Sequence, residues 1–297
     1  MEYIQRAFSI LIRRNIRKIK EENVWQLNSR SEFISSCFSQ SFSLPDSIIF
    51  YVLKNPTTTK LYQNLIQTCK YFFVKNPIIV SPNYSYSRDL GKWCIKKTPF
   101  DFSQLICKFW ITENYNISSI LPKLYKCDAK KVTFQNEVIS FYDLPLFTKT
   151  AEDITFNEIT VKDSDGSIVP FEKIFEAFIY ARKFKFSSDS TLPNITSKTF
   201  NELLKIPHFS KLELMNLNGI PDIFDIEAFY IYVKENKTTK FYLIFDNSIS
   251  ARYKNRLGEI IDEILSTNVL NYESPFIYFD GLEYDKILGL KLQYFHL

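Results

Sequence analysis

Residues 206–217 read IPHFSKLELMNL. Their apolar side chains recur at Ile206, Phe209, Leu212, Leu214 and Leu217. The run at 211–214 alternates polar with apolar residues, which is the period of a β-strand with one buried face. A helical apolar pattern precedes it at 197–206. The stretch therefore predicts a helix followed by a strand, and such a unit is too small to bury its own apolar face without stacked neighbours.

The same pattern recurs along most of the chain. Strand-like runs also lie at 131–134, 153–156, 183–186, 240–243 and 275–279, and helical candidates lie at 170–181, 224–235 and 250–266. The first core positions of the runs are Val132, Ile154, Phe184, Leu212, Phe241 and Ile277, so the steps are 22, 30, 28, 29 and 36 residues. These steps approach the length of a leucine-rich-repeat unit. The sequence thus predicts an α/β fold in which residues 81–297 form an irregular, leucine-rich-repeat-like β/α solenoid; an ordinary α/β sheet with helices on its faces is the alternative.

The alternation also predicts which side chains the sheet exposes. If the apolar residues of each run face the core, the residues between them face outward. Those residues are Thr133, Thr155, Lys185, Glu213 and Tyr242. The exposed sheet face is the usual recognition surface of a solenoid. We therefore expect these five residues to line a target-binding face; a merely solvated face is the alternative for each of them.

Residues 1–43 precede the repeats and predict a basic amphipathic helix with a linker. Apolar residues recur at helical spacing at Ile4, Phe8, Leu11, Ile12, Ile16 and Ile19. The helix is predicted over residues 1–28, with arginine and lysine on its other face as far as Lys20, and a serine-rich stretch follows at 29–43. The pattern suits a helix packed on the body of the protein, a membrane-surface helix or a mitochondrial presequence. A membrane contact by this segment is the weaker expectation.

Residues 44–80 predict a bundle of two or three short helices. Pro45 suits a first helical turn, and Asn55-Pro56 ends the helix because a residue before proline is pushed out of the α region. A threonine at 57–59 can cap the next helix. A bundle this small could not stand alone, so we expect it to pack on a neighbour or a partner.

Composition and motifs narrow the function. The net charge of the 297 residues is only +4, which does not favour a nucleic-acid binder. The five cysteines have no C-x-x-C spacing and indicate reduced thiols in the cytoplasm or nucleus. Only six glycines and two histidines occur, His208 and His296, and neither histidine has a metal-ligand or catalytic spacing. No phosphate-binding or hydrolase motif appears, so we expect a non-enzymatic protein without metal or cofactor.

Two segments carry a family resemblance. Residues 44–49, LPDSII, followed by 68–72, TCKYF, resemble an F-box, although Thr68 and Phe72 stand where the motif usually has Val and Trp. With residues 247–257, NSISARYKNRL, the wider chain resembles a divergent family of nematode F-box-like proteins.

The resemblance implies a substrate receptor of a cullin-RING ubiquitin ligase. The module at 44–80 would dock on a Skp-type linker subunit, and the repeats would hold an unknown target protein. The docking residues would be Leu44, Pro45, Ile48, Ile49 and Val52. The alternatives are a free-standing repeat scaffold with a structural, non-docking module, and a membrane-associated protein.

Overall fold

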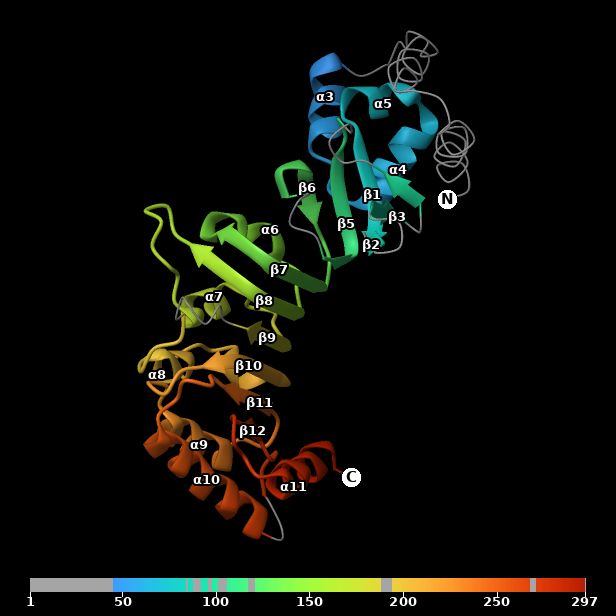
Figure 1. Cartoon of the computed structure of the whole chain (residues 1–297). Coiled ribbons are helices and arrows are strands. Elements are labelled where there is room, and N and C mark those ends of the chain that lie inside the picture. Colours follow the sequence, from blue (N-terminus) through green and yellow to red (C-terminus); the bar gives the residue numbers. More distant parts are fainter. Residues whose placement is uncertain are drawn as a thin grey trace. The chain divides into compact units, whose positions relative to one another are not determined.

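The computed structural model describes residues 45–83, 85–87, 92–95, 98–100, 106–116, 121–187, 194–267 and 271–296 (Figure 1). The predicted N-terminal helix and linker, residues 1–43, lie outside the described residues. Contacts divide the chain into two compact units. One contains residues 1–110 and 122–126, and the other contains residues 111–121 and 127–297. The contacts thus join the module at 44–80 to the segments that follow it, as far as residue 110.

Three short helices form the first part of the first unit. They are α3 (Asp46–Lys54), α4 (Thr59–Thr68) and α5 (Lys70–Lys75). Helix α3 stops at Asn55, directly before Pro56. The Thr58 hydroxyl caps α4 by accepting a hydrogen bond from Leu61 N at 3.1 Å. The proline and threonine positions therefore act as the sequence predicted.

The three helices share their core with strands of the same unit. Tyr62 of α4 packs with Ile78 of β1 (Ile78–Asn83) and with Trp110 of β5 (Lys108–Tyr115). The Tyr62 hydroxyl donates to Asn76 O at 2.7 Å and accepts from Ile78 N at 2.9 Å. Burial accordingly raises the pKa of Tyr62 well above its usual value. The bundle thus completes its core on its own chain, as its small size predicted.

Two sheets are present among the described residues. The smaller is antiparallel and contains β2 (Ser85–Ser87), β3 (Lys92–Ile95) and β4 (Thr98–Phe100). The larger is a nine-stranded, mostly parallel sheet in the order β1-β5-β7-β8-β9-β10-β11-β12, with β6 (Leu124–Cys127) paired to β5. Its later strands are β7 (Lys131–Ser140), β8 (Asp153–Lys162), β9 (Lys183–Ser187), β10 (Leu214–Ile220), β11 (Lys240–Phe245) and β12 (Phe276–Tyr278). From β7 to β12, each strand lies beside its predecessor in the chain.

Helices between the strands cover one face of this sheet. They are α6 (Pro145–Thr148), α7 (Phe171–Ala177), α8 (Thr199–Leu203), α9 (Ile226–Glu235) and α10 (Ala251–Ser266), with 3-10 turns at Leu121–Lys123, Phe141–Asp143 and Phe209–Lys211. Aromatic contacts join them to the strands. Phe147 of α6 lies 4.9 Å from Phe134, Phe175 of α7 lies 5.3 Å from Phe184, and Phe229 of α9 lies 5.1 Å from Phe241, measured between ring centroids. The core is therefore a layer of phenylalanines between the helices and the sheet.

The last helix, α11 (Tyr284–Phe295), packs on the opposite face of the sheet. Its Tyr294 ring lies 5.8 Å from Tyr242 and 6.3 Å from Phe276, and these two are register partners on β11 and β12. The Tyr242 and Phe276 rings are stacked with their centroids 4.4 Å apart. Helix α11 therefore covers the outward face at β11 and β12.

Charged residues at the amino ends of the strands repeat from one strand to the next. Lys130, Glu152, Arg182 and Glu213 each stand directly before a strand. The carbonyl of each residue in turn accepts the backbone N–H groups that open the next strand, as in Arg182 N to Glu152 O at 2.8 Å and Glu213 N to Arg182 O at 2.8 Å. Their side chains pair as Lys130–Glu152, Glu152–Arg182 and Arg182–Glu213.

This arrangement corrects the register expected for the central strand. Residues 211–214 are not a strand: Lys211 ends a 3-10 turn, and β10 begins only at Leu214. Met215 and Leu217 are the buried pair, while Leu214 is half-buried. In the segment LELMNL, apolar residues stand at the even positions 212 and 214 and at the odd positions 215 and 217, so either set could face the core. Leu212 is also buried, although it precedes the strand. The spacing of apolar residues alone therefore could not show which alternate residues of the strand face the core.

Candidate interaction surfaces

Helix α3 divides the predicted docking residues between two faces. Pro45 and Ile48 are exposed, as is Val52, and Ile48 shows 46% of its surface. Ile49 is buried at 7% exposure, so its place is in the core of the first unit. Leu44 lies outside the described residues. Three of the five predicted residues thus share an exposed face, because positions three and four apart coincide on a helix.

Buried contacts on the inner side of α3 hold the helix in place. Ile49 and Leu53 pack with Phe72 of α5. The Asn76 side chain donates from Nδ2 to Leu53 O at 2.6 Å, and the Tyr125 hydroxyl donates to Lys54 O at 2.9 Å. These two bonds satisfy carbonyls at the C-terminal end of the helix. The outer face of α3 is therefore presented by a helix that is anchored from within.

Tyr51 joins the exposed face, although the sequence reasoning did not include it. It shows 69% of its surface and lies three residues after Ile48. We call Pro45, Ile48, Tyr51 and Val52 the α3 stripe. Phe50 is also exposed, but it lies on another side of the helix, where Lys54 Nζ sits 4.4 Å from its ring centroid. An exposed apolar stripe of this kind is typical of an interaction site.

The outward face of the sheet brings four of its five predicted residues into one row. Thr133 pairs with Thr155, Thr155 with Lys185, and Lys185 with Asn216 of β10. Asn216 in turn pairs with Tyr242. Asn216 thus stands where Glu213 was expected, and Glu213 instead bonds to Arg182, whose Nε lies 2.8 Å from its carboxylate.

The row is not equally accessible along its length. Thr133, Thr155, Lys185 and Asn216 are half-buried. Tyr242 is half-buried as well, because it is packed between Phe276 and Tyr294 of α11. Burial also raises the pKa of Tyr242. The outward surface that remains to a partner therefore lies over β7 to β10.

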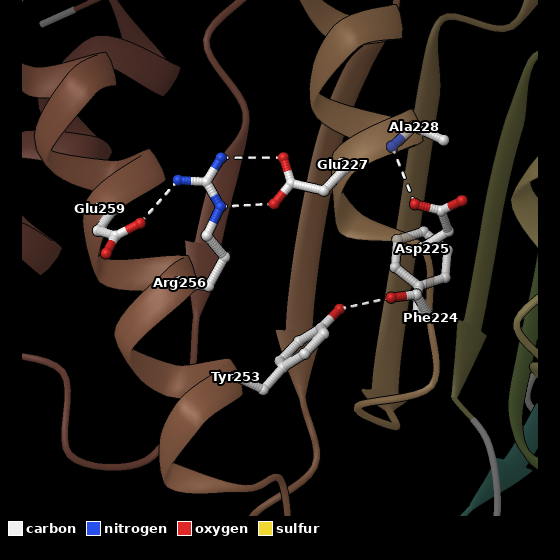
Figure 2. Close-up of polar contacts among 7 residues, drawn as sticks. All are labelled: Phe224, Asp225, Glu227, Ala228, Tyr253, Arg256 and Glu259. Atoms are coloured by element: carbon white, nitrogen blue, oxygen red, sulfur yellow. Dashed lines mark hydrogen bonds and ion pairs between the residues drawn. The ribbon is translucent and has the colours of Figure 1, made fainter.

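Helices α9 and α10 are joined by a polar network on the helical face (Figure 2). The Arg256 guanidinium binds the Glu227 carboxylate through Nε and Nη2, with Nη2 2.9 Å from Oε2, and binds Glu259 through Nη1 at 2.7 Å. The Tyr253 hydroxyl donates to Phe224 O at 2.7 Å. The Arg256 guanidinium holds the pKa of Glu227 below its usual value. Both carboxylates thus bind the same arginine, which indicates that the network serves to hold α9 and α10 together.

Two titratable side chains of the second unit, His208 and Cys127, lie in the core. His208 is buried and donates from Nε2 to Phe175 O at 3.2 Å. Burial lowers the pKa of His208, so it is a neutral core residue. Burial also raises the pKa of the Cys127 thiol to about 12, which leaves it protonated and unreactive at neutral pH.

The described part of the chain contains neither a metal-ligand cluster nor a membrane-spanning helix. Within the ranges given above, no group of three histidine, cysteine, aspartate or glutamate side chains could hold a metal ion. No helix in that same part of the structure has the length and apolarity needed to cross a membrane.

Comparisons with protein-family models, with curated proteins and with solved structures gave no match. The α3 stripe and the outward face of the sheet are therefore the candidate functional surfaces of the described residues.

Proposed function

We propose that this chain is a protein-interaction adaptor of the F-box type, which couples a target protein to a cullin-RING ubiquitin ligase. The α3 stripe would dock on a Skp-type linker subunit, and the sheet of the second unit would hold the target. The single observation that carries the proposal is the α3 stripe. It is an apolar face on an anchored helix, and it contains three of the five predicted docking residues.

The sheet supports the second half of this proposal. Strands β7 to β12 follow one another in chain order, helices lie between them, and one backbone contact repeats at their amino ends. These features favour a leucine-rich-repeat-like solenoid over a doubly wound sheet, in which strand order departs from chain order. A solenoid uses its extended sheet face to bind a partner.

The test is the affinity of the purified full chain for each Skp-type linker subunit of its own species, measured by calorimetry. A double variant, Ile48→Asp with Val52→Asp, places charges on the stripe and should abolish binding. Phe50→Asp is the matched control, because Phe50 is equally exposed on the same helix but off the stripe. Equal loss in the control, or no binding by the wild type, would contradict the docking role.

A free-standing scaffold is the second candidate, and one observation favours it. Ile49, Leu53 and Tyr62 build the core of the first unit together with Ile78 and Trp110. The helical module is therefore needed to fold its own unit whether or not it docks. Under this alternative the stripe variants would leave every function of the chain unchanged.

A further inference from the structure

The outward face of the sheet in the second unit carries lysines at two successive levels, where a level is a set of register partners on neighbouring strands. At the first level, Lys131 of β7, Asp153 of β8 and Lys183 of β9 stand side by side. At the second level, Lys185 of β9 stands beside Thr155 of β8. All of them face outward, because the residues that alternate with them are buried in the core. We call Lys131, Lys183 and Lys185 the lysine group.

The lysine group is accessible and is not engaged by carboxylates. Lys131 and Lys183 are exposed, and Lys185 is half-buried. None of the three ammonium groups has an ion-pair partner among the residues that the structure describes. By contrast, the cations directly before the strands, Lys130 and Arg182, are paired with neighbouring glutamates. The lysine group therefore keeps its charge available to a partner.

The amino half of the outward face is positively charged. Asp153 is the only acidic residue at these two described levels of β7, β8 and β9, so three lysines stand against one carboxylate. Its Oδ1 atom is buried and has no hydrogen-bond partner among the described residues. Further carboxylates lie toward the carboxyl ends of the strands, as at Glu158 of β8 and Asp246 directly after β11. The charge of the amino half therefore favours a negatively charged partner.

The spacing of the lysine group suits an extended polypeptide. Lys131 and Lys183 are two strands apart, so their backbones are separated by about 10 Å. Lys183 and Lys185 are two residues apart on one strand, which corresponds to about 7 Å. An extended chain advances about 3.3–3.6 Å per residue, so acidic residues two or three positions apart match both spacings. The Thr155 hydroxyl and the Asn216 amide flank Lys185 and can form hydrogen bonds with the backbone of such a chain.

We propose that the amino half of the outward face, over β7 to β9, binds an acidic, extended segment of the target protein. The carboxylates of the segment would pair with the lysine group, and its backbone would bond to the polar side chains beside Lys185. The inference deepens the proposed function and rests on the part of it that assigns the target to the sheet. It does not depend on docking through α3.

Titration of the full chain with short peptides tests this proposal. Amide NMR spectra would be recorded while acetyl-Glu-Ser-Glu-Ser-Glu amide is added, and again with glutamine in place of each glutamate. We expect saturable shifts in β7, β8 and β9 with the glutamate peptide alone, and weaker binding as salt is added. Equal shifts with the glutamine peptide, shifts confined to other elements, or no shift at all would overturn the proposal.

Two variants change the charge of the face in opposite directions. The triple variant Lys131→Gln, Lys183→Gln, Lys185→Gln should weaken binding of the glutamate peptide about tenfold or more, because several modest ion pairs are lost together. Asp153→Asn should strengthen binding about twofold or more, since it removes the carboxylate that stands among the lysines. Unchanged binding in the triple variant, or weaker binding in Asp153→Asn, would contradict the proposal.

A matched control removes the same charge from the helical layer. Its three substitutions are at exposed lysines at the end of α6, within α7 and at the start of α8: Lys149→Gln, Lys173→Gln and Lys198→Gln. This control should bind the glutamate peptide as the wild type does. A loss as large as in the first triple variant would show that only the overall charge attracts the peptide, and would overturn the proposal. The affinity for the linker subunit is measured separately and decides docking through α3 whatever the peptides do.

Discussion

Asn136 and Glu158 lie at the same level of neighbouring strands, and both have left-handed backbone with φ of 54°. The pairs on either side of them, Gln135 with Asn157 and Glu137 with Ile159, fix this alignment. Gly219 of β10 also has a positive φ, of 75°, and sits where the register with β11 shifts. Positive φ and a register shift are marks of a bulge, so regular pairing is interrupted toward the carboxyl ends of these strands.

The left-handed backbone at Glu158 predicts an unusual order of stabilities. Glu158→Asn should raise the free energy of unfolding by roughly 0.5–1 kcal/mol, because asparagine tolerates this conformation. Glu158→Val should lower it by about 1–2 kcal/mol, since a β-branched residue is strained there. Urea unfolding would measure both changes. A valine variant as stable as the wild type would mean that the backbone at Glu158 is not left-handed.

The two faces of α3 predict opposite responses to truncation. Leu53→Ala should lower the free energy of unfolding by about 2–5 kcal/mol, because Leu53 is 1% exposed and packs with Phe72. Val52→Ala, its neighbour on the stripe, should change it by less than about 0.5 kcal/mol. Thermal unfolding of the two variants checks the assignment. The reverse order would show that the helix faces have been exchanged.

Burial of His208 predicts a loss of stability in mild acid. The folded-state pKa lies below the unfolded value of about 6.5, so the unfolded chain binds the extra proton first. Stability is therefore complete above that unfolded value and falls as the pH drops through it towards the folded pKa. Comparing the melting temperature of wild type and His208→Gln across this range isolates the contribution. An identical pH dependence in both proteins would rule out His208 as the cause.

The Arg256 network predicts a small, salt-sensitive contribution to stability. Arg256→Ala should lower the free energy of unfolding by about 0.5–1 kcal/mol at low salt, because the groups are partly exposed. The difference should shrink when salt is added. Arg252→Ala is the control, since Arg252 is exposed on the same helix and has no ion-pair partner among the described residues. If the two changes lowered the free energy of unfolding equally, the ion pairs of Arg256 would not contribute to stability.

Local patterns in the sequence predicted most of the strands and helices from β7 onward, but none of the strands β1 to β6. Five of the six strand-like runs coincide with strands, because alternation along a strand needs no information from distant residues. The sixth run, residues 211–214, was displaced, because β10 begins only at Leu214. Two sets of alternate residues in LELMNL could face outward, and only the pairing of Asn216 with Lys185 and Tyr242 shows which set does. Tyr51 could have been found from its helical spacing to Ile48.

Other parts of the candidate sites carried no local signal. The packing of Tyr294 on Tyr242 joins residues 52 positions apart, and nothing in either neighbourhood indicates it. The left-handed backbone at Glu158 is equally hidden, because glutamate has no preference for it.

Amide hydrogen exchange of the full chain, with and without a bound Skp-type linker subunit, tests the adaptor role most directly. We expect the linker to slow exchange in residues 46–54, which form α3, and to leave residues 131–162 of β7 and β8 unchanged. Protection elsewhere with none at α3, or no change anywhere because no linker binds, would contradict it.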